Sequence, residues 1–414
     1  GPLLLAHKVV GWGYTGLGQV QEAIDHYQLA VAGAEKWGDK PTLANAYSAL
    51  GLQEYLGGRF EAAREHLGRS LALFRDSANE LRAVNSLHVL CRVWVAEGEH
   101  ARAAEALVQA LDLEIEGNER WAADAHAILG ETHVLRSQWA EAATHYQQAL
   151  EIRTAASHMP GIVEAKVALG FVDQCVGNWA SAASHYQNAV RLAATMDQSP
   201  QQVLASRHLG RLRLVAGDLD GAAAHIEFAL ALADSMRGTL EYAPTLLAAA
   251  ELRFHQMDFQ HALEFASRSL EHAHPLHDII EAHVALCRIN VALGRAGPAA
   301  MHSHEAVEKA TRLGSSRLLS SSHLAAALSA GQDARASFEI ALQHANNAAA
   351  PLERAAVLHN YASSLRRTNS SPDLAHSLEV EGSAVIQTLR HELGGVPFRL
   401  QDRSPDRRNQ QRLR

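Results

Sequence analysis

Small and large apolar residues recur along the chain at helical spacing. The segment QWAEAATHYQQAL at 138–150 has near-copies through most of the chain, among them VQEAIDHYQLAV at 20–31 and WASAASHYQNAV at 179–190. In most copies a small residue is followed four positions later by a large apolar residue and three positions after that by a second small one. Spacings of four and three place all three residues on one stripe of an α-helix. The pattern therefore predicts repeated amphipathic helices.

The first small residue of each copy is an anchor that measures the period. The anchors are Ala23, Ala63, Ala103, Ala142, Ala182, Ala222, Ala262, Ala299, Ala334 and Ala375. They lie 40, 40, 39, 40, 40, 40, 37, 35 and 41 residues apart. Such a period predicts a solenoid that grows by stacking units, and not the two or three globular domains that 414 residues would otherwise suggest.

Two glycines recur at fixed places in the unit. Twelve residues before the anchor come Gly11, Gly51, Gly130, Gly170 and Gly210, and five residues before it come Gly18, Gly58, Gly98, Gly177, Gly217 and Gly294. The first set falls in mid-helix, where glycine costs about 1 kcal/mol relative to alanine, so we expect a neighbouring helix backbone to approach closely there. The second set predicts a helix end and turn. The unit is thus helix, turn, helix, and the fold class is all-α.

These residues resemble a known family. The order G-x2-Y-x3-G-x4-A-x3-Y-x2-A at Gly11, Tyr14, Gly18, Ala23, Tyr27 and Ala30 is similar to the tetratricopeptide repeat (TPR), whose usual unit is about 34 residues. The longer unit of this chain resembles the branch found in kinesin light chains, Pins-type adaptors and bacterial regulators of the MalT and AfsR kind. The resemblance spans roughly residues 3–345 and implies a right-handed α-solenoid of about nine to ten helix pairs.

The regularity changes towards the C-terminus. We expect a superhelical repeat domain at 1–345, with a change of pitch or a junction of subdomains near 271–300, where Pro298 enters the turn. In residues 346–393 the looser pattern predicts a divergent last helix pair, with helices at 353–367 and 373–393. Residues 394–414 are rich in arginine and lack an apolar period, which predicts a flexible tail.

Composition limits the partners and the cellular compartment that we expect. The formal net charge of −8 gives no reason to expect nucleic acid as a partner, except through the Arg-rich tail, and no apolar run is long enough to cross a membrane. The three cysteines form no CxxC pair, which favours a reducing compartment, the cytoplasm. Gly1-Pro2 resembles a protease-cleavage scar, so we expect a piece of a larger protein.

The sequence motifs give little indication of a catalytic site. Gly11–Gly16 matches G-x-G-x-x-G, but the register places it inside a helix, whereas a dinucleotide site needs a preceding strand. A ladder of histidines follows the anchors by three residues, at His26, His66, His145, His185, His225 and His302, and we interpret it as a packed surface. We therefore predict no enzyme and no cofactor.

Two alternatives stay open. The loop at 272–278 brings His272, His274 and His277 next to Asp278, a composition that suits a metal-dependent hydrolase. A self-assembling structural adaptor is the other alternative, because solenoids also associate through their ends.

The TPR resemblance implies where a ligand binds. In TPR proteins the first helix of each unit, the leading helix, lines the concave groove. The ligand contacts the positions six and three residues before, and one residue after, the mid-helix glycine of that helix. In this chain these positions supply Asn45, Ser48, Asn85, His88, Arg92, Glu131, Arg207, Arg211 and Arg288. Asparagine binds both N–H and C=O of an extended peptide, and arginine binds a carboxylate through two bonds. We predict a non-catalytic module that binds a protein or peptide segment, or another domain of its parent, as the sensor or scaffold of a bacterial signalling or transcription-regulating protein.

Overall fold

Paired helices make up the molecule. The computed structural model describes residues 2–16, 19–111, 119–196, 200–330 and 334–395, and within these ranges it contains twenty α-helices, one short 3-10 helix and no strand. The helices are α1 (Pro2–Gly16), α2 (Val20–Trp37), α3 (Lys40–Leu56), α4 (Phe60–Asp76), α5 (Glu80–Glu97), α6 (His100–Leu111), α7 (Glu119–Leu135), α8 (Trp139–Ala155), α9 (Met159–Val176), α10 (Trp179–Ala193), α11 (Pro200–Ala216), α12 (Leu219–Ala233), η1 (Asp234–Met236), α13 (Tyr242–His255), α14 (Phe259–His272), α15 (Leu276–Ala292), α16 (Ala296–Leu313), α17 (Ser316–Ser329), α18 (Arg335–Asn347), α19 (Pro351–Arg367) and α20 (Pro372–Gly395).

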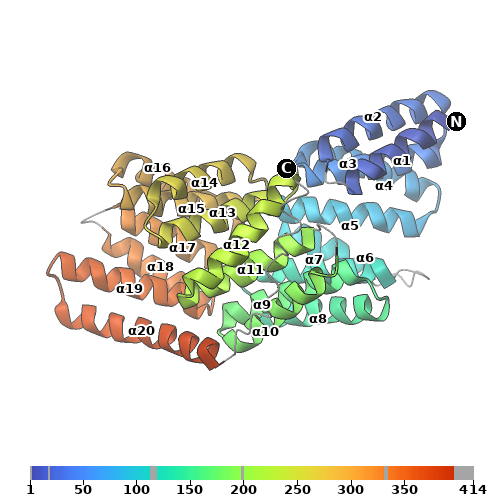
Figure 1. Cartoon of the computed structure of the whole chain (residues 1–414). Helices are drawn as coiled ribbons and strands as arrows, with labels where there is room; N and C mark the ends of the chain where they lie inside the picture. Colours follow the sequence, from blue (N-terminus) through green and yellow to red (C-terminus); the bar gives the residue numbers. More distant parts are fainter. Residues whose placement is uncertain (1, 17–18, 112–118, 197–199, 331–333, 396–414) are drawn as a thin grey trace, which may run out of the picture.

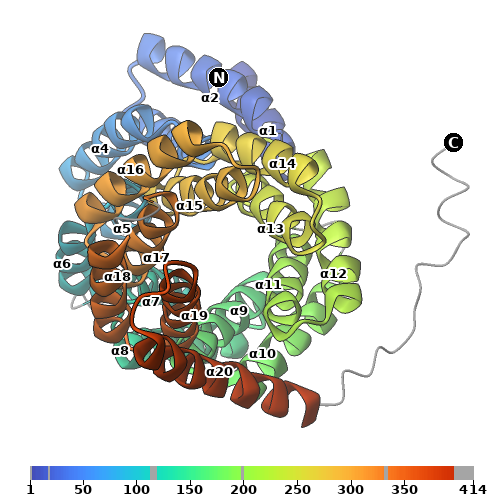
Figure 2. The same ribbon diagram turned by 90° about the vertical axis from the view of Figure 1, so that its left-hand side faces the viewer.

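Each odd-numbered helix packs against the next even-numbered one, and the pairs stack in chain order (Figure 1). Viewed along the axis of the stack, the odd-numbered helices from α7 to α19 lie on the inner side and their even-numbered partners on the outside (Figure 2). The predicted all-α repeat solenoid of about nine to ten helix pairs is confirmed. The same order continues through α13–α16, where the spacing of the anchors shortens.

The stripe of small and large residues packs the two helices of each unit together. In α10, Ala182, Tyr186 and Ala189 have no exposed surface, and the corresponding residues of the other units are buried as well. The mid-helix glycines face this stripe: a Cβ atom on Gly170 would lie 2.7 Å from the Tyr186 ring, and one on Gly51 would lie 2.6 Å from Leu67. The predicted close approach of a helix backbone is present at Gly51 and Gly210, where a backbone atom of the unit's second helix would lie 3.3 Å from the added Cβ atom. The large side chain of that helix lies closer still.

The turn glycines behave as predicted where the structure describes them. Gly58, Gly98, Gly177, Gly217 and Gly294 have φ angles between 69° and 95°, the left-handed conformation that favours glycine. Gly18 lies outside the described residues.

Successive turns of the superhelix touch. His274 lies against Gly58, Leu276 and Leu313 lie beside Gly98, and the Trp139 indole N–H donates to the carbonyl of Ala348 at 2.6 Å. The superhelix therefore closes on itself after one turn, which encloses the space on its inner side.

The two C-terminal helices are present as predicted. α19 and α20 cover the expected helices at 353–367 and 373–393, and Leu389 and Leu393 of α20 pack with Trp179 and Val163. Residues 396–414, the greater part of the predicted tail, lie outside the described residues. None of the described helices has the length and apolar character needed to span a membrane.

Candidate functional site

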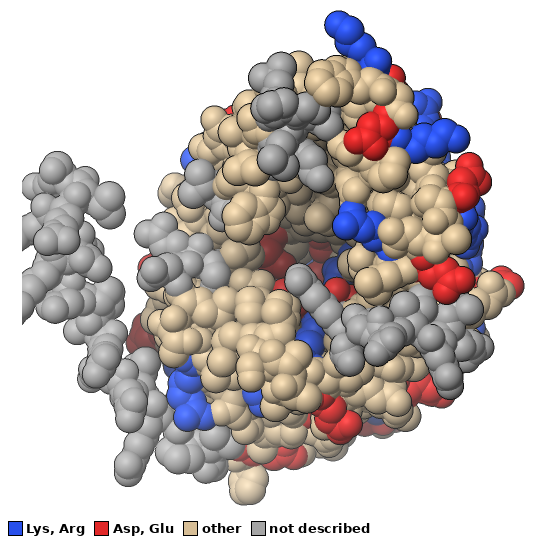
Figure 3. All heavy atoms as spheres, turned by 90° about the vertical axis from the view of Figure 1, so that its right-hand side faces the viewer, with Lys and Arg blue, Asp and Glu red and all other residues tan. Residues whose placement is uncertain are grey.

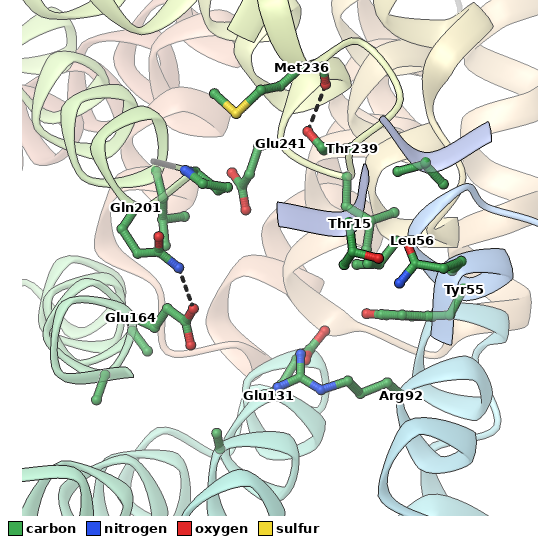
Figure 4. Close-up of a pocket in the computed structure, with 18 of the residues that line it drawn as sticks. Thr15, Tyr55, Leu56, Arg92, Glu131, Glu164, Gln201, Met236, Thr239 and Glu241 are labelled. Carbon is green, nitrogen blue, oxygen red and sulfur yellow. Dashed lines mark hydrogen bonds between the residues drawn. The ribbon is translucent and has the colours of Figure 1, made fainter. Parts of the chain in front are cut away.

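A cavity of about 770 Å³, the N-terminal cavity, opens on the inner side of the superhelix (Figure 4). Its polar lining comes from several helices and from the segment between α12 and α13. It consists of Thr15, Gln53, Tyr55, Arg92, Glu131, Arg153, Glu164, Gln201, Ser235, Thr239 and Glu241. Its apolar lining includes Leu56, Ala127, Ala165, Ala168, Leu204, Met236 and Leu240. The molecule is hollowed on the side of its N-terminal helices, and acidic side chains lie inside this hollow (Figure 3).

Arg153 organises one wall of the N-terminal cavity. It reaches inward from α8, is almost fully buried, and pairs with Asp124 at 2.8 Å and with Glu164 at 3.6 Å. It also donates to the carbonyl of Gly161 at 3.0 Å. Glu164 accepts a second bond from the Gln201 amide at 3.0 Å, so α7, α8, α9 and α11 are joined by polar contacts at the cavity wall.

Arg92 of α5 and Glu131 of α7 lie together on another wall, and the ring of Tyr55 of α3 lies near Arg92 (Figure 4). Burial by itself lowers the pKa of Arg92, but Tyr55, Asp124 and Glu131 outweigh it and hold that pKa above its usual value. Burial raises the pKa of Tyr55, so its hydroxyl keeps its proton at neutral pH. This wall therefore presents a cation, an anion and a neutral hydroxyl.

A second cavity of about 390 Å³, the C-terminal cavity, lies farther along α9 and α11 and extends to α20. Arg211 binds Glu251 through two bonds of 3.0 and 3.1 Å, and Glu281 lies 3.7 Å from Arg211. Arg317 binds Glu281 at 2.8 Å and approaches Glu353 to 3.7 Å. Burial opposes ionisation of Glu281, but Arg317 and Arg211 lower its pKa to about 2. The inner face of this cavity is a continuous chain of ion pairs.

The structure divides the predicted ligand-binding residues into three groups. Arg92 and Glu131 line the N-terminal cavity, whereas Arg211 and Arg288 line the C-terminal cavity. Arg207 is buried and bound to Glu241 at 2.7 Å.

The remaining predicted residues line neither cavity. Asn45 accepts a bond from Arg82, Ser48 accepts one from Ser86 at 3.2 Å, and Asn85 is exposed. The His88 imidazole lies 3.9 Å from Asp124.

Several cavity residues escaped the sequence-based prediction. Glu164 stands six residues before the mid-helix position of the fifth unit, and Glu251 stands one residue after that of the seventh. Applying the same register to those two units would have found both residues. Gln201 and Glu241 stand nine before that position, outside the register. Nothing in the repeat pattern indicates Arg153, because it reaches the cavity from the end of a second helix.

The histidine-rich loop does not converge on one point. His272 meets the ring of Tyr242 edge-on, His274 packs on Gly58, and His277 approaches Asp278 at 3.4 Å. Across the described residues, no three His, Cys, Asp or Glu side chains are placed to hold a metal ion. The constellation that the hydrolase alternative needs is therefore not formed in this part of the chain.

Three members of the histidine ladder, His26, His145 and His302, pair with a histidine of the first helix in the same unit. His126 and His145 approach to 3.0 Å between their Nδ1 atoms, as do His283 and His302, and His7 and His26 approach to 3.1 Å. Two Nδ1 atoms share a proton only if one ring donates and the other accepts. Burial lowers the pKa of His126 and lowers that of His283 to about 4, which keeps these rings neutral.

Comparison with known proteins identifies the repeat. Two family models described as tetratricopeptide repeat match residues 13–76 and 125–160. The chain contains tetratricopeptide repeats. The matches support the TPR superfamily and do not distinguish the long-repeat branch from others. No curated protein sequence matches the chain.

Solved structures share the helical solenoid fold. A Rap protein complexed with competence and sporulation factor has 12% identity and a TM-score of 0.58, with 94% of this chain and 99% of that chain covered. The Rap conjugation gene regulator of the plasmid pLS20, in complex with the Phr* peptide, has 11% identity and a TM-score of 0.54, with 76% of this chain and 97% of that chain covered. At these identities the likeness concerns the fold alone.

Proposed function

We propose that this TPR chain binds an extended peptide segment in the N-terminal cavity, without catalysis, as the sensor or scaffold part of a bacterial signalling or transcription-regulating protein. The TPR fold is generally a scaffold for protein interaction. The observation that carries the proposal is the cavity itself, because its space of about 770 Å³ has apolar walls and a few charged groups from separate helices. Ligand sites in proteins have this composition and size.

The dimensions suit a short peptide. A residue of extended chain spans about 3.3 Å, so a few residues fit along a cavity that draws on α3, α5, α7, α9 and α11. Amide and hydroxyl groups of Gln53, Gln201 and Tyr55 offer hydrogen bonds to a peptide backbone, and the alanines leave room for side chains. One of the two Rap structures named above holds a peptide in the same type of solenoid.

A peptide array tests the proposal. Purified full chain is incubated with an array of random eight-residue peptides, and the affinities of the peptides selected are measured by calorimetry. We expect Arg92→Glu to weaken these affinities at least tenfold while the helical circular dichroism stays the same. Arg335→Glu is the matched control, because Arg335 is exposed on α18, far from the cavity lining.

Two outcomes would contradict the proposal. The first is an array on which no peptide binds the parent chain. The second is equal affinity for the parent and the Arg92→Glu variant. Light scattering on the same samples checks the adaptor alternative, which predicts that the mass grows with concentration in the absence of peptide.

A further inference from the structure

The N-terminal cavity contains an excess of carboxylate, and two of its lining residues have a buried polar atom without a partner, Gln53 at Oε1 and Arg153 at Nε. Glu131 forms no ion pair within the described part of the chain, although it lines the cavity. Gln53 also lines the cavity and is only 1% exposed, and its side-chain oxygen accepts no hydrogen bond. A buried acceptor without a donor is costly, so this oxygen indicates that a donor group completes the site.

The charges around the cavity do not balance. Arg153 pairs most closely with Asp124, at 2.8 Å, and Arg207 pairs with Glu241, at 2.7 Å. After these two pairs, Arg92 remains as one positive charge beside two carboxylates, Glu131 and Glu164. Arg153 reaches Glu164 only at 3.6 Å, so it cannot fully neutralise Glu164 as well as Asp124. The cavity therefore carries one net negative charge.

The C-terminal cavity provides a contrast in the same molecule. Its lining carboxylates, Glu251, Glu281 and Glu353, each have an arginine within 3.7 Å. Its remaining arginine, Arg288, rests over the ring of Phe254. Only the N-terminal cavity combines an excess of carboxylate with an unsatisfied buried acceptor among the cavities that the structure describes.

We propose that the N-terminal cavity receives one basic side chain, arginine or lysine, of the bound peptide. Glu131 and Glu164 lie on two sides of the cavity and hold the positive charge between them, while Gln53 accepts a hydrogen bond from the same group or from the adjacent backbone N–H (Figure 4). Arg92 faces a carbonyl or carboxylate of the same peptide. This inference rests on the proposed function and adds to it the chemical class of the ligand.

The test removes the positive charge of the peptide's basic side chain and keeps the size of that side chain nearly the same. Each peptide selected on the array is synthesised again with citrulline in place of arginine, or with glutamine in place of lysine, and its affinity for the parent chain is measured. We expect one basic position in each peptide at which the neutral residue weakens binding at least tenfold. Peptides that bind equally well without any basic residue would overturn the inference while leaving the proposed function intact. An array without binding would overturn both.

A double-mutant cycle then locates the charge in the protein. Glu131→Gln should weaken binding of the basic peptide and leave that of the citrulline peptide unchanged, so the two losses are not additive. Glu264→Gln is the matched control, because Glu264 is exposed on α14 and lines neither cavity. Additive losses would mean that Glu131 does not meet the basic group. The assignment of the site would then be wrong.

The chain's own C-terminal segment is the rival occupant. Residues 396–414 contain six arginines and two aspartates, so they share the chemistry expected of the ligand. We expect a variant that ends at Gly395 to bind the selected peptides with unchanged affinity. A tenfold gain on deletion would show that this segment competes for the cavity, and it would overturn the assignment of a separate peptide as the occupant.

Discussion

A glycine in the middle of a leading helix makes room for a large side chain of the neighbouring helix. Gly51, Gly130, Gly170 and Gly210 each face the large residue of the second helix, with hypothetical Cβ contacts of 2.6 or 2.7 Å. The unfavourable helix propensity of glycine is offset at these positions by the burial of a leucine, tyrosine or isoleucine side chain. Conversely, a glycine that faces no neighbour costs stability without such a gain.

Two alanine substitutions separate these cases. Gly170→Ala should destabilise the protein by about 1 to 3 kcal/mol, because the new methyl group would overlap the Tyr186 ring. Gly68→Ala in α4 meets nothing within 4 Å and should stabilise it by up to about 1 kcal/mol. Thermal and urea unfolding of both variants measures the difference. Stabilisation by both alanines would show that the register of the stripe is wrong.

Asp278 is a partly buried carboxyl with a perturbed pKa. Burial raises the pKa from 3.8 to about 6, and Glu281 adds to this effect while His277 opposes it. Because the folded state binds the proton more tightly, Asp278 contributes stability that is complete below pH 3.8 and is lost as the pH rises through about 6.

The substitution Asp278→Asn should remove the loss of stability that accompanies ionisation of Asp278. The variant should gain stability relative to the parent between pH 4 and pH 7, by up to about 3 kcal/mol. Urea unfolding at four pH values across this range measures the gain, and Asp220→Asn, at an exposed position of α12, is the control. Parallel curves for the parent and the Asp278 variant would rule out the proposed titration.

At the scale of the helix, one register position sets much of the inner surface. The residue after the mid-helix position is Arg92, Glu131, Phe171, Arg211, Glu251 and Arg288 in successive units from the third to the eighth. Two neighbouring members of this series, Arg211 and Glu251, are joined by two hydrogen bonds. Apart from Phe171, positive and negative residues alternate at this position of the inner face.

This face marks the limit of what the sequence could predict. Helical periodicity predicted the pairs, the buried stripe and the turn glycines, because these depend on residues within one unit. The same register brought Arg92, Glu131, Arg211 and Arg288 to the cavities. It could not show that Arg207 binds Glu241, because that contact depends on how two units are rotated relative to each other.

At the scale of the whole molecule, the contact between turns determines how far the inner space is enclosed. Leu276 and Leu313 belong to the same buried cluster as Trp94 and Val95, although about 180 to 220 residues separate them along the chain. No repeat pattern indicates such a contact, because it joins units that are about five periods apart. The enclosure of the cavity is thus a property of the complete superhelix.

Removing an apolar side chain from this contact should open the superhelix. A Cβ atom on Gly98 would lie 3.4 Å from a methyl group of Leu313, so Leu313→Ala weakens the junction of the turns directly. Leu252→Ala removes a side chain of the same size from the core of α12–α14, where only adjacent units meet. Both variants should lose about 2 to 5 kcal/mol of stability.

Only Leu313→Ala should change the shape of the molecule. Small-angle scattering is expected to give a larger radius of gyration for this variant than for the parent, and an unchanged one for Leu252→Ala. Peptide affinity should fall with the expansion, because the walls of the N-terminal cavity come from both ends of the closed turn, from Thr15 on α1 to Glu241 ahead of α13. Identical scattering from all three proteins would mean that the stacking of adjacent units alone sets the curvature, and that the contact between turns follows from it.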